Sequence, residues 1–230
     1  MIKLEKTDIY GWEAAIRGMR NPLNSWERID SRECEIGYYI GPQDHDLMMR
    51  LAKGGSTHAK YRRMITVYVD ITAPLYWWKE FDTYKVGTVA NSCSTMHKIH
   101  DKEFTIDDFS HEHLLGLFST DGELADPSIE TAGGDLYSCS GLFKFLLIPL
   151  LNECRELYLL SNDKKYWWQM IQLLPSSYNQ KRTVMLNYEV LAAMYNDRKN
   201  HKLDEWHTFC DWIRELPYSE IITGAEAENG

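Results

Sequence analysis

The stretch RMITVYVDITAPLYWWKEF, residues 63–81, joins two hydrophobic patterns and decides the fold. In its first half apolar and polar residues alternate, which predicts a strand with one strongly buried face. The residues of that face are Ile65, Val67, Val69 and Ile71. At Thr72-Ala73-Pro74 the pattern changes, since threonine caps helices and proline fits a first helical turn. We therefore expect a helix over residues 73–84.

The polar stretch EFDTYKVGTVANSCSTMHK, residues 80–98, follows at the end of that helix. Its many hydroxyl, amide and amino groups emerge where the chain leaves a rigid element, a position that suits ligand binding. A solvated loop is the simpler interpretation, and position alone favours it. The stretch is therefore a candidate site that needs support from elsewhere in the chain.

Further helices are predicted in four segments, and we expect one helix-rich α+β domain spanning residues 1–230. Acidic turn signals mark residues 101–135, which we expect to form a variable surface insertion. The helical segments are GWEAAIRGMR (11–20), DHDLMMRLAKGG (44–55), SGLFKFLLIPLLNECRELYLL (140–160, buried, with a bend near Pro149) and KKYWWQMIQLLP (164–175). Residues 182–216 are predicted to be helical with breaks.

Composition excludes several classes of function. The net charge of −9 argues against binding a nucleic-acid polymer, which needs clustered positive charge. No apolar run reaches membrane-spanning length and no signal-peptide core opens the chain, so we expect a cytoplasmic protein. The five cysteines are scattered without metal-type spacing, which indicates free thiols. The high aromatic content suits thick packing or a subunit interface, for which the runs at 76–78 and 166–168 are candidates, although both could fill the core of one chain.

A cation lies on an apolar helical stripe near the C-terminus. The spacing of Asn187, Leu191, Met194 and Arg198 places them on one helical face. Arg198 could simply extend out of a helix end, or it could reach an anionic or carbonyl-rich ligand, which a guanidinium suits. The histidines, such as His97 and His100, lie in acidic surface-type sequence, so we expect no metal site.

Together these segments resemble the flavin-dependent thymidylate synthases, the ThyX family. The order is His58, the strand, Ala73-Pro74, the helix and the polar stretch, where the family has the motif RHRxxSxNExSxRY. Towards the C-terminus, Leu174-Pro175, Asn187, Arg198 and His201 follow at nearly family spacing. The resemblance covers roughly residues 40–98 and 150–216.

The resemblance implies a homotetramer that binds FAD and dUMP, with NADPH and methylene-tetrahydrofolate as co-substrates. It implies that Arg198 activates the uracil ring and that Ser94 matches a family serine at the catalytic position. The resemblance also implies cofactor contacts from His58, Lys85, Asn91, Asn187 and His201. It implies substrate contacts from Glu80, Tyr84 and Arg198. A bacterial or phage origin is implied as well.

The chain departs from the family pattern in the polar stretch. Thr83-Tyr84-Lys85 lies opposite the RHR triplet, so hydroxyls and one ammonium replace guanidinium groups. Each charge-assisted hydrogen bond is worth about 1.5–3 kcal/mol, so three losses would weaken anion binding by several decades. Either the ligand differs or other cations substitute, and Arg62 and Arg63 are candidates.

Two classes of function follow. One is a flavoenzyme that methylates dUMP or a related nucleotide, which the retained Asn187, Arg198 and His201 favour. The other is a non-catalytic oligomer of the same fold that binds a nucleotide or a protein partner, which the missing RHR triplet favours. A helical structural protein with an accidental likeness would not reproduce the order of the motifs.

Overall fold

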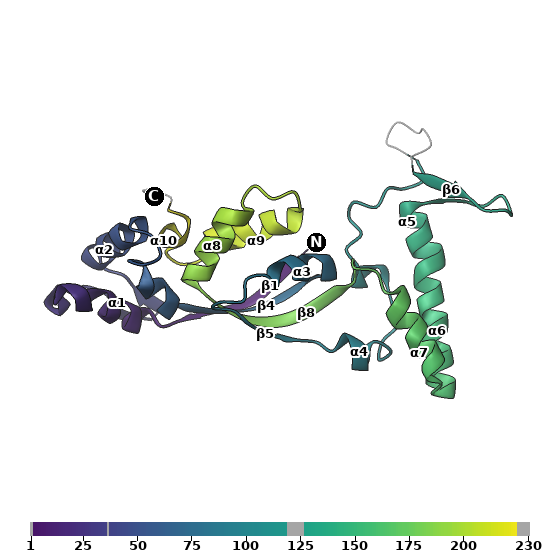
Figure 1. The fold of residues 1–230 in the computed structure, drawn as a ribbon, viewed down its shortest axis with the longest axis horizontal. Helices are drawn as coiled ribbons and strands as arrows, with labels where there is room; N and C mark the ends of the chain where they lie inside the picture. Colours follow the sequence, from purple (N-terminus) through teal and green to yellow (C-terminus); the bar gives the residue numbers. More distant parts are fainter. Residues whose placement is uncertain (1, 36, 119–126, 225–230) are drawn as a thin grey trace. The chain divides into compact units, whose positions relative to one another are not determined.

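The computed structural model describes residues 2–35, 37–118 and 127–224, and its contacts divide the chain into two compact units (Figure 1). The sheet unit comprises residues 2–72, 79–91 and 181–224, and the hairpin unit comprises residues 73–78 and 92–180. The predicted helix-rich α+β fold with a small antiparallel sheet is confirmed. The expectation of a single domain stays a prediction.

A four-stranded sheet, in the order β1-β4-β8-β5, carries the sheet unit, and α8 and α9 lie on one side of it (Figure 1). Strands β1 and β4 are antiparallel, with Ile9 opposite Val67. The strands of the sheet are β1 (Lys3–Tyr10), β4 (Thr66–Pro74), β5 (Val89–Ser92) and β8 (Asn179–Asn187). A separate hairpin consists of β2 (Arg32–Cys34) and β3 (Gly37–Tyr39). The helices are α1 (Trp12–Arg20), α2 (Pro42–Lys53), α3 (Leu75–Phe81), α8 (Tyr188–Arg198), α9 (Asp204–Glu215) and α10 (Glu220–Thr223).

Strand β4 follows the predicted alternation. Ile65, Val67, Val69 and Ile71 are all at most 1% exposed. The predicted boundary with the helix was wrong by two residues, because Ala73 and Pro74 continue the strand and α3 begins at Leu75. Both residues are buried there, so a proline at the end of a strand replaces the proline expected in a first helical turn.

The prediction that residues 182–216 are helical with breaks was wrong for the first six of them. Residues 182–187 belong to β8, where Val184 and Leu186 are buried at the period of a strand. Asn187 is therefore the N-cap of α8, and its Oδ1 accepts a hydrogen bond from the Val190 N–H at 2.9 Å. The predicted common face holds for Leu191 and Met194, which are buried, and for Arg198 at the end of the helix.

The hairpin unit is built on two long helices, α6 and α7, which pack side by side (Figure 1). Its elements are α4 (Thr95–Lys98), β6 (Ser128–Glu130), β7 (Leu136–Ser138), α5 (Cys139–Leu142), α6 (Ile148–Ser161) and α7 (Lys164–Leu173). A π-helical turn over Phe143–Leu147 lies just before Pro149, the position where a bend was predicted. A proline has no N–H with which to donate a hydrogen bond to a carbonyl of the preceding helical turn. The helix is therefore often irregular just before a proline.

The predicted burial of residues 140–160 was wrong for part of the segment, since Phe145 and Leu160 are 68% and 85% exposed in the single chain. On α7, Trp168 is 43% exposed. The reverse holds for the other aromatic run, since Trp77 and Trp78 are at most 1% exposed and fill the interior of the chain. Of the two runs proposed for a subunit contact, the one at 166–168 thus leaves an aromatic ring accessible.

The predicted surface insertion at residues 101–135 is partly buried. Phe104 and Phe109 are at most 4% exposed and belong to the apolar core of the hairpin unit. Between them a capping box joins Thr105 to Asp108, which also pairs with Lys102. These apolar anchors within acidic sequence explain why its first part is not a surface loop. Residues 119–126 lie outside the described residues.

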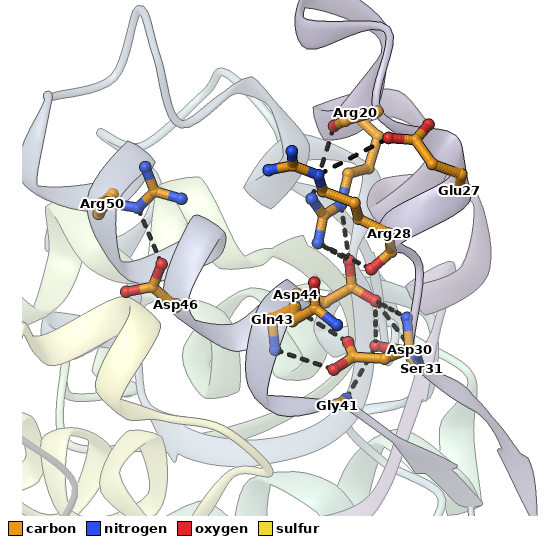
Figure 2. A network of polar contacts seen from close by, with 11 residues as sticks. Arg20, Glu27, Arg28, Asp30, Ser31, Gly41, Gln43, Asp44, Asp46 and Arg50 are labelled. Atoms are coloured by element: carbon orange, nitrogen blue, oxygen red, sulfur yellow. Dashed lines mark hydrogen bonds and ion pairs between the residues drawn. The ribbon is translucent and has the colours of Figure 1, made fainter.

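A buried ion pair ties α1 to α2 (Figure 2). Arg20, 4% exposed, contacts the fully buried Asp44 at 2.7 Å through Nη2 and at 2.8 Å through Nε. The second oxygen of Asp44 accepts hydrogen bonds from the N–H groups of Asp30 and Ser31 and from the Ser31 hydroxyl. Gly41 is required beside it, since a Cβ there would lie 2.2 Å from the carboxyl carbon of Asp30.

Strand β1 and the β2–β3 hairpin were not predicted from the sequence, because their apolar alternation is weak and their residues are largely exposed.

All five cysteines are free thiols, as predicted. Within the described residues, no helix is long and apolar enough to cross a membrane.

Candidate functional site

Four predicted site residues meet in the sheet unit around the guanidinium of Arg198. This side chain ends α8, where its Nε donates to the Tyr84 hydroxyl at 2.9 Å and its Nη1 to Glu80 Oε2 at 2.8 Å. The guanidinium also lies over the ring of Trp206, 4.8 Å from its centre. Contacts on both its edge and its face fix the orientation of a side chain that is otherwise flexible.

Glu80 receives several donors at a single oxygen. Besides Arg198, Trp206 Nε1 donates to Oε2 at 2.8 Å, and His201 Nε2 lies 3.3 Å away. His201 Nδ1 accepts the N–H of Leu203 at 3.2 Å, so in the neutral ring the proton is on Nε2, the nitrogen that lies near Glu80. The carboxylate therefore orients both the cation and the imidazole.

Tyr84 completes the cluster. Its hydroxyl accepts from Arg198 and donates to Asp197 Oδ2 at 3.1 Å. Burial raises the pKa of Tyr84, and the neighbouring Arg198 offsets only part of that effect. The phenol is therefore protonated at neutral pH and remains a hydrogen-bond donor.

The polar stretch after α3 forms a tight turn. The hydroxyl of Thr83 donates to the Glu80 carbonyl at 2.7 Å, and the hydroxyl of Thr88 donates to the Tyr84 carbonyl. Gly87 has a φ of +82°, and a Cβ there would lie 2.6 Å from Nδ2 of Asn187. Several small polar groups of this stretch thus close the turn and bring it against the start of α8.

Gly87 provides a first test of this arrangement. Gly87→Ala is expected to lower the free energy of unfolding by about 2–3 kcal/mol, because a left-handed conformation and a clash with Asn187 add together. Gly55→Ala is the matched control, since Gly55 has a φ of +83° but a Cβ there would meet no atom within 4 Å. Urea unfolding measures both, and equal losses would show that the turn does not press on Asn187.

A cavity of about 440 Å³ lies beside this turn in the sheet unit. Predicted residues Tyr84, Lys85 and Asn187 line it. The remaining lining residues are Arg63, Thr83, Val86, Gly87, Glu189, Val190 and Ala193. Its volume is in the range of small-molecule sites.

Three predicted residues are placed elsewhere. His58 is exposed in the turn after α2, against Gly54, and does not line this cavity. Asn91 is exposed on β5, and within the described part of the chain its side chain makes no hydrogen bond. Ser94 belongs to the hairpin unit, where its Oγ caps α4 by accepting the His97 N–H at 3.1 Å.

Trp206 and Asp197 belong to the cluster although neither was predicted to take part. Trp206 is fully buried and supplies both a ring face and an N–H to the cluster. Tryptophan spacing alone carries no signal for such a role. For metals, no group of three or more His, Cys, Asp or Glu side chains suited to an ion occurs in residues 2–35, 37–118 and 127–224.

Comparison with solved structures gives the fold. The flavin-dependent thymidylate synthase ThyX of Helicobacter pylori, crystallised with FAD and dUMP, superposes with a TM-score of 0.62 at 13% identity over 96% of both chains. A second structure of that enzyme with FAD and dUMP gives 0.61 at 15% identity, over 95% of this chain and 96% of that one. The UMP/dUMP methylase PolB of Streptomyces cacaoi, bound to 5-bromo-dUMP, gives 0.58 at 15% identity, over 97% and 95%.

No protein-family model and no curated protein sequence matches the chain. The three-dimensional likeness nevertheless extends over nearly the whole length of each neighbour. The chain therefore has a divergent ThyX-like fold.

Proposed function

We propose that the protein is a flavin-dependent thymidylate synthase-like enzyme, which transfers a methyl group to dUMP or a related pyrimidine nucleotide. The observation that carries the proposal is the fixed guanidinium of Arg198, the residue to which the family resemblance assigns activation of the uracil ring. The structural neighbours support it, since they were crystallised with FAD and dUMP or with a brominated dUMP.

Arg198 is suited to stabilise negative charge that develops on a pyrimidine carbonyl. Its Nε and Nη1 are held by Tyr84 and Glu80, whereas its Nη2 makes no hydrogen bond with any residue described. A donor fixed before the reaction costs no reorganisation when charge develops. His201 and Trp206 hold Glu80, and Glu80 in turn holds the guanidinium.

The residues of the cavity fit part of a flavin nucleotide. Arg63 and Lys85 supply two cations and Asn187 an amide, which suit phosphate and carbonyl oxygens. When bound, FAD reduced by NADPH would supply the reducing equivalents, and methylene-tetrahydrofolate would supply the carbon. In this proposal Lys85, Asn187 and His201 contact the cofactor, and Glu80 and Tyr84 contact the substrate side through Arg198. His58, Asn91 and Ser94 keep their assignments only as implied by the resemblance.

The homotetramer and the bacterial or phage origin implied by the resemblance are part of the proposal, as is the cytoplasmic location expected from the sequence. The exposed apolar side chains of α5–α7 and the π-helical turn support self-association, since a subunit contact would remove them from water. These side chains include Phe145, Leu150, Leu159, Leu160 and Trp168.

A specific observation favours the second candidate, a non-catalytic oligomer that binds a nucleotide or a protein partner. Glu80 neutralises Arg198 directly, and Ser94 is engaged in capping α4. A ligand anion would have to compete with Glu80 for the guanidinium. The loss of the family's RHR triplet points in the same direction.

The visible absorption spectrum separates the two candidates. We expect the purified protein, mixed with FAD and desalted, to retain the bands of an oxidised flavin. A desalted mixture of FAD with an unrelated protein controls for carry-over. A protein that stays colourless would contradict the flavoenzyme and leave the second candidate.

A further inference from the structure

Two cations face the cavity beside the turn without a partner. Arg63 and Lys85 line it, and neither forms an ion pair or a side-chain hydrogen bond with a residue in the described ranges. Both are exposed, so each can move toward a ligand. The chain as a whole carries a net charge of −9, so these two cations supply positive charge at one cavity of an acidic protein.

The neighbouring Arg62 behaves differently. It is 7% exposed, its Nε lies 3.0 Å from Glu189, and its Nη1 donates to the Ile221 carbonyl at 3.1 Å. Arg62 is therefore occupied, and of the two arginines only Arg63 is available to a ligand. The same contact compensates the charge of Glu189, the one carboxylate among the described residues that line the cavity.

The turn also contains backbone N–H groups that are available to donate hydrogen bonds to a ligand. Val86 and Gly87 line the cavity, and among the described residues nothing accepts a hydrogen bond from either N–H. Consecutive N–H groups at a turn with a positive φ form a concavity that binds anions. The turn is closed by its own hydroxyls, so these backbone donors are held in place before a ligand arrives, whereas the Lys85 side chain stays mobile.

We propose that Arg63 and Lys85, with the amides of Val86 and Gly87, bind the phosphate of a nucleotide ligand. Arg63 lies outside the motif that carries the family's arginines and substitutes for the guanidinium groups missing there. The identification of the ligand as a nucleotide rests on the proposed function. The phosphate belongs either to the diphosphate of FAD or to the monophosphate of a pyrimidine nucleotide, and Arg63 and Lys85 bind it in both cases.

Binding measurements on the full-length chain test the proposal. FAD, riboflavin, dUMP and inorganic pyrophosphate are titrated into the wild type, Arg63→Ala, Lys85→Ala and the control Arg50→Ala by calorimetry, with thermal unfolding as the check on folding. Arg63→Ala and Lys85→Ala should each weaken binding of at least one phosphate compound about 10- to 100-fold, and binding should weaken with salt. Any binding of riboflavin, which has no phosphate, and all binding by Arg50→Ala should be unchanged.

The ligands separate the possible outcomes. An effect confined to FAD identifies its diphosphate, an effect confined to dUMP identifies a monophosphate, and both support the site. Binding of pyrophosphate or dUMP that depends on Arg63 and Lys85, without any flavin binding, supports the site and contradicts the proposed flavoenzyme. If every phosphate compound that binds the wild type also binds Arg63→Ala and Lys85→Ala with unchanged affinity, the site is overturned, and FAD binding in that result leaves the flavoenzyme intact. A wild type that binds none of the three phosphate compounds also overturns the site.

Discussion

Replacing Arg198 by alanine is expected to abolish complementation of a thymidine-requiring strain and to lower turnover by at least about 10²–10³-fold, the usual effect of removing one preorganised donor. The substitution removes the guanidinium that lies over Trp206 and whose Nη2 is not used within the described residues. Glu80 then loses its cationic partner but keeps the hydrogen bond from Trp206. We therefore expect lost chemistry in a folded protein.

Two variants and one further measurement separate a catalytic from a structural role. Arg198→Lys keeps the charge but cannot contact Tyr84, Glu80 and a carbonyl at once, so it should not restore activity. Arg50→Ala removes an exposed arginine whose ionic partner is Asp46 and should leave activity unchanged. Light scattering should show the same assembly for all variants. Complementation by Arg198→Ala would exclude the catalytic role.

Residues with strong local patterns could be predicted from the sequence. The alternation around Val67 and the helix stop at Gly54 come from local periodicity and backbone preference, and both match the structure. The resemblance also named Glu80, Tyr84, Arg198 and His201, which the fold brings into one cluster.

The contacts within that cluster could not be predicted. Glu80 and Trp206 are 126 positions apart, and no spacing rule indicates that one donates to the other. Arg62 and Arg63 are adjacent and chemically identical, yet the fold pairs the first with Glu189 and leaves the second beside a cavity. Ser94 matched a family position, whereas its hydroxyl is used to cap α4. Such differences depend on long-range packing.

The largest expected loss of stability comes from Asp44→Ala. The fully buried Asp44 carboxylate accepts hydrogen bonds from Arg20, Asp30 and Ser31, so its removal leaves a buried guanidinium uncompensated (Figure 2). Arg20 would retain only Ser25 Oγ at 3.5 Å and the Arg28 carbonyl at 3.3 Å. Breaking a buried pair in this way costs about 3–5 kcal/mol. For a chain of this size that lowers Tm by roughly 10 °C.

Asp46→Ala is the matched control, because Asp46 lies two residues further along α2 and pairs with Arg50 in water. Its side chain is 67% exposed, and such a pair contributes at most about 0.5 kcal/mol. Both variants should be compared by thermal and urea unfolding at pH 7. Equal unfolding midpoints for Asp44→Ala and Asp46→Ala would show that the ion pair between α1 and α2 does not hold these helices together.

The neighbouring Asp30 makes the stability depend on pH. Burial opposes the ionisation of Asp30, but the N–H groups of Gln43 and Asp44 lower its pKa. The stabilisation from Asp30 is therefore present above its ordinary pKa and is lost as the pH falls through the lowered value.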